Sequence, residues 1–212
     1  MSRFRIPHRR VLRLLKDVLL RDVLLDVLLN DEQGAALLEF AISLPLLMVF
    51  VVGIYDFSGA FNQKQKIEQA AQEAAIIAGS QPTSDIAASA GDTNPPSLQA
   101  VSTAVFNSLT ASGVLAVGAC TPPGTPSGPT GLTWVYQITG CNGGFPGDIL
   151  QITINRGSVS TVSTPAVVGT VVSVQYPYHW RFNSVIQLLF PGSTTYAATT
   201  LVKESATVHN QM

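Results

Sequence analysis

An almost uninterrupted apolar run of 21 residues, Ala35 to Tyr55, limits most strongly what this chain can fold into. As a helix it would be about 30 Å long, which matches the hydrocarbon core of a bilayer. A buried core helix is usually shorter than this. A cleaved secretory signal would be shorter, begin earlier and end in a small-x-small site. The sequence therefore predicts a transmembrane helix over residues 35–55.

Basic residues lie mainly before this run. Seven of the 12 Lys and Arg residues precede position 22, and after the run only Lys64 and Lys66 lie near it. Because basic flanks stay in the cytoplasm, we expect a cytoplasmic N-terminus and export of the chain after about residue 56. With 12% charged residues, 46% hydrophobic residues and a net charge of −1, the composition argues against an ordinary cytoplasmic enzyme and against nucleic acid as a partner.

The run contains one charged residue, Glu39, whose insertion into lipid costs a few kcal/mol. One interpretation is that the carboxylate simply reaches back to the cytoplasmic interface. The other uses its distance from Gly34, because a cut after Gly34 would make Ala35 the first residue and Glu39 the fifth. The new amine of Ala35 would then pair with Glu39 of a neighbouring subunit and set the stagger between the two.

These residues also carry a resemblance to known families. The stretch Gly34-Ala-Ala-Leu-Leu-Glu39-Phe40 resembles the prepilin peptidase site of type IV pilin-like proteins, and residues 34–79 resemble the TadE-like family of tight-adherence (Flp) pilus pseudopilins. The features that match are Glu39-Phe40-Ala41, Leu44-Pro45, Gly53, Asp56-Phe57 and the alanines around Glu73, followed near the C-terminus by Tyr176-Pro177-Tyr178 and Lys203-Glu204.

The resemblance implies cleavage between Gly34 and Ala35, and assembly contacts through Glu39, Phe40 and Pro45. It implies a single-pass protein of the bacterial inner membrane, with its C-terminal domain in the periplasm. The partners it implies are membrane lipid, a prepilin peptidase, other pilins or pseudopilins and the inner-membrane pilus platform. Oligomers would form through the N-terminal helix.

Two helical segments are predicted on either side of the apolar run. Residues 1–34 form a basic leader in which residues 9–30 have one polar and one Val/Leu face, as in a helix on the inner membrane surface or against a partner. Residues 56–80 are expected to continue the apolar helix as a stalk, from about 36 to 78, with a stop at Gly79 and Pro82. Lys64 and Glu68 are one turn apart and form a predicted weak pair, and Pro45 would kink or thin the lipid part of the helix.

Residues 81–212 are predicted to form an exported α+β domain: a second helix, then a small antiparallel sheet, the order expected of a pilin-like fold. The second helix starts at Asn94-Pro95-Pro96 and runs to Gly113. In the Gly/Pro-rich loop 118–147, extended structure should be confined to Leu132–Thr139. Further strand signals cover Ile149–Asn155, Val167–Tyr178 and Thr194–Val208, with a short helix at Phe182–Phe190.

The only two cysteines, Cys120 and Cys141, fall in the exported part, so we expect a disulfide, with two buried thiols as the alternative. Metal and cofactor sites are not expected, since only His179 and His209 remain there as soft ligands. Asp148 is interpreted as a turn residue, and His179, in an aromatic cluster, as a core residue or a partner contact.

No catalytic motif is found, so we expect a structural protein, not an enzyme. An uncleaved adhesion module and a tethered exported enzyme using His179 or His209 are the alternatives.

Overall fold

The computed structural model describes residues 32–88, 94–116, 118, 120–142, 145, 147–160, 167–182 and 199–210. The chain divides into two compact units, residues 1–53 and 54–212, which are taken in turn. The predicted leader helix at 9–30, and nearly all of the short helix expected at 182–190, lie outside the described residues.

Helix α2, Glu32–Ser80, is long and apolar enough to cross a membrane. The predicted helix over 36–78 is therefore confirmed, with Pro45 inside it. In the first unit its apolar side chains are exposed, as with Leu37 and Ile42, each 70% accessible. The helix ends at Ser80, shortly before Pro82, which cannot donate the backbone hydrogen bond that a helix needs.

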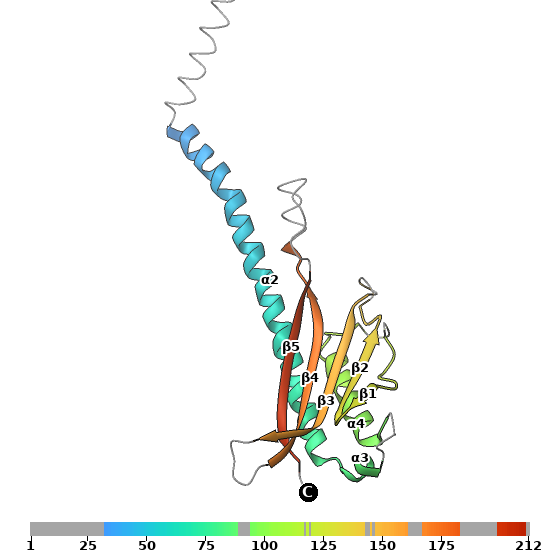
Figure 1. Cartoon of the computed structure of the whole chain (residues 1–212). Helices are drawn as coiled ribbons and strands as arrows, with labels where there is room; N and C mark the ends of the chain where they lie inside the picture. The colour runs from blue at the N-terminus through green and yellow to red at the C-terminus, as the bar shows by residue number, and fades with distance from the viewer. Residues whose placement is uncertain are drawn as a thin grey trace, which may run out of the picture. The chain divides into compact units, whose positions relative to one another are not determined.

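The second unit is built on one antiparallel sheet whose five strands are neighbours in sequence order (Figure 1). Along Thr133–Thr139 and most of Val167–His179, alternate side chains are buried, as the two-residue period of a strand requires when one face is covered. The predicted α+β class is confirmed. The strands are β1 Ser127–Thr130, β2 Thr133–Thr139, β3 Ile149–Ser160, β4 Val167–His179 and β5 Thr199–His209.

Two strand predictions need correction. Extended structure in the loop 118–147 is not confined to 132–139, because β1 pairs with β2. Pro129 in β1 lacks an amide hydrogen, which an edge strand tolerates, and that residue hid the strand in the sequence. Strand β3 continues to Ser160, beyond the predicted end at Asn155, through a register shift between Asn155 and Ser158.

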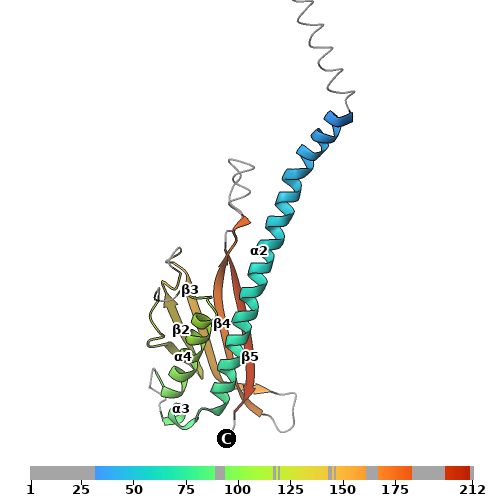
Figure 2. The same cartoon turned by 180° about the vertical axis from the view of Figure 1, so that it is seen from behind.

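Two helices cover one face of the sheet: α4, Pro96–Ala111, and the C-terminal part of α2 (Figure 2). Helix α2 presents alanines to this interface, and their small side chains allow a close approach to the sheet. Helix α4 presents larger apolar residues at helical spacing. The fully buried apolar members are Ile67, Ala70, Ala71, Ala74, Ala78, Leu98, Val101, Val105 and Leu109.

Polar side chains fix the turn between these helices, where the short helix α3, Ser84–Ala88, lies. Asp85 accepts a hydrogen bond from the amide of Ser97 at 2.9 Å, which satisfies a free amide in the first turn of α4. Arg156 of β3 is 3% exposed and donates to the carbonyls of Ala78, Gln81 and Pro82. Burial lowers the pKa of Arg156, and the nearby carboxylate of Asp85 opposes this change.

Cys120 and Cys141 form a disulfide, as predicted, and the alternative of two thiols is wrong. The bond ties the segment that follows α4 to the residues just after β2. Closing a loop of 21 residues removes entropy from the unfolded chain and contributes about 3 kcal/mol.

Candidate functional site

The residues predicted for processing and assembly lie in the first unit, on α2. Gly34 and Ala35 are in its first turn, and Glu39 lies about one turn further along with its side chain exposed. Phe40 is 61% exposed. Within the described residues Glu39 makes no hydrogen bond or ion pair, so its carboxylate is available to a group from another molecule.

In the second unit, a buried carboxylate joins α2 to the end of β4. Asp56 is 2% exposed, and its two oxygens accept hydrogen bonds from the Tyr178 hydroxyl at 2.9 Å and from the Phe182 amide at 2.7 Å. Gly59 makes this approach possible, because a Cβ at that position would lie 2.6 Å from the Tyr178 hydroxyl oxygen. Burial, together with the hydrogen bond to Asp56, raises the pKa of Tyr178 to about 12. The hydroxyl therefore stays protonated and donates at neutral pH.

Two further contacts fasten α2 to the last two strands. Gln63 Nε2 donates to the carbonyl of Pro177 at 3.2 Å, and Lys64 Nζ lies 3.5 Å from Glu204 Oε1. The predicted pairing of Lys64 with Glu68 is wrong: Glu68 instead accepts a hydrogen bond from Gln72. A partner on β5 competes for Lys64 only once the chain has folded, so local helix spacing did not reveal it.

Aromatic side chains surround the junction at which α2 meets the end of β4. Trp180 packs edge-on against Phe57, with ring centroids 5.3 Å apart, and against Tyr178 at 5.1 Å. Its indole Nε1 donates to Thr200 Oγ1 at 2.6 Å. The indole thus combines apolar packing with a satisfied polar edge.

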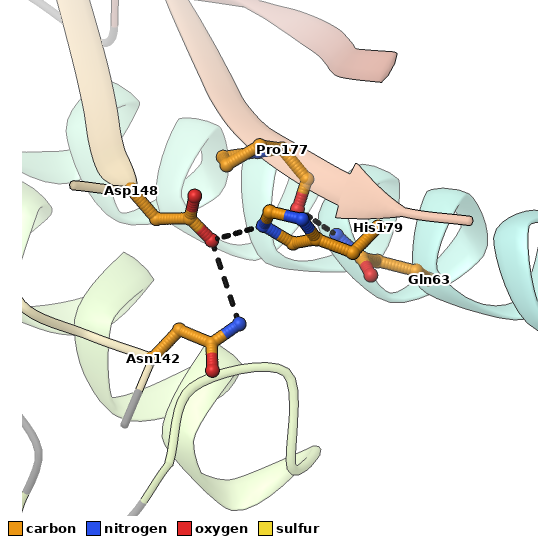
Figure 3. A network of polar contacts seen from close by, with 5 residues as sticks. All are labelled: Gln63, Asn142, Asp148, Pro177 and His179. Atoms are coloured by element: carbon orange, nitrogen blue, oxygen red, sulfur yellow. Dashed lines mark hydrogen bonds and ion pairs between the residues drawn. The ribbon is translucent and has the colours of Figure 1, made fainter. Parts of the chain in front are cut away.

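Asp148 and His179 form a polar pair next to the junction (Figure 3). His179 Nε2 lies 2.7 Å from Asp148 Oδ2, which also accepts from Asn142 at 3.4 Å. The imidazole stacks on Phe145, with centroids 3.5 Å apart. The turn predicted at Asp148 is present, since its amide donates to the Phe145 carbonyl at 3.0 Å. Its pairing with His179 was not predicted, since two polar side chains distant in the sequence give no local pattern.

Asn142, Phe145 and His179, but not Asp148, border an open cleft of about 830 Å³ between α2 and the end of β4. Lys66 of α2 and Arg181, just after β4, stand on its walls, and Tyr176 forms part of its floor. Tyr176 is 2% exposed, and its hydroxyl has no hydrogen-bond partner among the described residues. The sequence marked Tyr176 only as part of a Tyr-Pro-aromatic piece and gave no sign of the cleft.

The described chain is thus an α+β protein that carries one helix able to span a membrane and an antiparallel sheet packed on the second half of that helix. Residues 34–75 match the family model for TadE-like proteins, which confirms the predicted resemblance over this segment. The match begins at Gly34, the glycine singled out by its distance from Glu39. No curated protein and no solved structure matches the chain.

Proposed function

We propose that this protein is a pseudopilin-like structural or assembly component of a tight-adherence (Flp, type IV-like) pilus or secretion system. A prepilin peptidase cuts after Gly34 and releases Ala35 as the new N-terminus. The apolar helix holds the subunit in the bacterial inner membrane, with the leader in the cytoplasm and the α+β domain in the periplasm. Subunits then associate with one another, and with the platform proteins, through this helix.

The observation that carries the proposal is the match to TadE-like proteins over residues 34–75, which starts at the expected cleavage position. Two features of the molecule support it. The apolar side chains that follow Gly34 are exposed, so they are free to contact lipid or neighbouring helices. Glu39 lies among them without a partner in the described part of the chain, so an amine from a neighbouring subunit would satisfy it.

Cleavage is tested by sequencing the N-terminus of the protein isolated from cells with and without prepilin peptidase. We expect Ala35 first in the peptidase-positive cells and the intact leader in the others. Gly34→Leu should block processing, while Gly53→Ala, on the same helix where a Cβ meets nothing within 4 Å, should leave it unchanged. A leader retained in both strains would contradict the proposal.

The role of Glu39 is tested separately from cleavage. Glu39→Gln keeps the size of the side chain and removes its charge, so it should spare insertion and reduce assembled pili or cell adherence. Ser43→Ala is the matched control, because Ser43 lies one turn further along and its hydroxyl bonds only within its own helix, to the Phe40 carbonyl at 3.1 Å. Unchanged assembly in Glu39→Gln would remove the proposed pairing.

An uncleaved binding module is the second candidate, and the open cleft is the observation that favours it. An enzymatic role finds less support. His179 is held against Asp148 and stacked on Phe145, an arrangement suited to fastening a loop. We therefore propose a function in assembly, without catalysis.

A further inference from the structure

We propose that the cleft between α2 and the end of β4 binds the phosphate of an anionic phospholipid from the outer leaflet of the membrane. This inference rests on the proposed orientation of the helix in the membrane, but it is independent of leader cleavage and of assembly. It is carried by the charge of the cleft walls, by an unsatisfied hydroxyl on its floor and by the place of the cleft along the chain.

The charges on the cleft walls favour an anion. Lys66 and Arg181 contribute two cations, and no Asp or Glu is among the described residues that line the cleft. Neither cation forms a hydrogen bond or an ion pair with any residue in the described part of the chain. The contrast with Lys64 is informative, because that lysine, two positions earlier on the same helix, is paired with Glu204.

The floor of the cleft offers a hydrogen-bond donor that the fold leaves unused. Tyr176 is nearly fully buried, and its hydroxyl has no partner among the described residues. Burial, with the nearby charge of Asp148, raises the pKa of Tyr176 to about 12, so the hydroxyl keeps its proton. A buried polar group without a partner is costly and needs an explanation. The hydroxyl is not accessible from the cleft, so a phosphate oxygen would satisfy it only after a small shift of the Tyr176 ring on binding.

The position of the cleft along the chain favours a lipid as the source of that phosphate. The cleft wall includes Tyr55, the last residue of the apolar run. It also includes Arg181, and the amide of the next residue, Phe182, donates to Asp56. Tyr55, Trp180 and Phe145 add aromatic rings to the wall. Tryptophan and tyrosine are enriched where a membrane meets water, because their rings are apolar and their polar edges need a partner.

The test uses the full-length protein in an uncharged detergent, titrated with phosphatidylglycerol or with phosphatidylcholine, and bound lipid is counted by native mass spectrometry. We expect phosphatidylglycerol to bind about tenfold more tightly, because it keeps a net negative charge. The double variant Lys66→Gln/Arg181→Gln should lose about tenfold or more of that affinity, since charged hydrogen bonds are lost. Tyr176→Phe should weaken binding about threefold without lowering the melting temperature.

Lys64→Gln/Lys203→Gln is the matched control, since it also removes two positive charges, both outside the cleft, and should retain wild-type affinity. An equal loss of affinity in this control would mean nonspecific attraction and would overturn the proposal. Equal affinity for the two lipids would overturn it as well. Inorganic phosphate that displaces the lipid at equal concentration would show a site for a free anion, and the assignment to lipid would be wrong.

Discussion

Three tyrosines of the second unit differ in the hydrogen-bond acceptor of their hydroxyl, so the same Tyr→Phe substitution at each shows how much stability each acceptor contributes. Tyr178 donates to the carboxylate of Asp56 at 2.9 Å, Tyr136 donates to the side-chain oxygen of Asn94 at 3.1 Å, and the hydroxyl of Tyr176 has no partner in the described chain. Replacing each by Phe removes one oxygen and little else. The acceptor is therefore the main difference among the three variants.

The expected losses follow from the acceptors. A hydrogen bond to a charged group contributes about 1.5–3 kcal/mol, so Tyr178→Phe, at a partly exposed ring, should cost about 2 kcal/mol. Tyr136→Phe, with a neutral acceptor, should cost about 1 kcal/mol. Tyr176→Phe should cost nothing, or raise stability, because it removes a buried group that the fold leaves unsatisfied.

The assay is thermal unfolding of the full-length protein in detergent, followed by tryptophan fluorescence. For a chain of this size, each kcal/mol lowers the melting temperature by about 2–4 °C. We therefore expect a fall of about 4–8 °C for Tyr178→Phe, about 2–4 °C for Tyr136→Phe, and no fall for Tyr176→Phe. If Tyr176→Phe were as destabilising as Tyr178→Phe, the ranking by acceptor would be refuted.

Further predictions concern the glycine contact, the disulfide, the buried arginine and alkaline pH. Gly59→Ala should push the Tyr178 ring away from Asp56 and lower the melting temperature, whereas Gly53→Ala, with open space around it, should not. Reducing the Cys120–Cys141 bond should cost about 3 kcal/mol, measured by urea unfolding with and without reductant. Arg156→Met should cost about 3 kcal/mol in the same assay, because three carbonyls lose their donor. Burial raises the pKa of each of the three tyrosines to about 12, above the ordinary value of 10.0. The folded state therefore holds these protons more tightly, and stability should be complete below about pH 10 and fall as the pH rises towards about 12. A free energy of unfolding that does not change between about pH 10 and pH 12 would contradict this.

Several elements of the fold followed from local sequence patterns. The helix over 36–78, the helix start at Pro96 and the strand at Leu132–Thr139 were each predicted to within a few residues, because apolar spacing and helix stop signals are local properties. Strand β1 was missed for the same reason. Its Gly128 and Pro129 disfavour a strand locally, and only pairing with β2 makes one.

In the candidate site, too, the sequence identified single residues but not the contacts that the fold creates between them. Gly34 and Glu39 were identified by their spacing in an apolar context, and the family match begins at the first of them. Asp56 and the Tyr176–Tyr178 piece were each noticed as parts of the resemblance, but nothing in the sequence joined them. Asp56 and Tyr178 are separated by 122 positions, and their hydrogen bond exists only because α2 packs along β4.

By itself, the sequence determined that this chain carries a membrane-length apolar helix, and it predicted the disulfide that the structure shows, because the length of an apolar run and the number of cysteines are properties of the linear chain. The tertiary structure alone decided which polar groups were satisfied and which were not. It paired Asp56 with Tyr178 and Asp148 with His179, and it left the hydroxyl of Tyr176 and the charges of Lys66 and Arg181 around one cleft. Such outcomes depend on the competition between all neighbours in three dimensions, which no local pattern records.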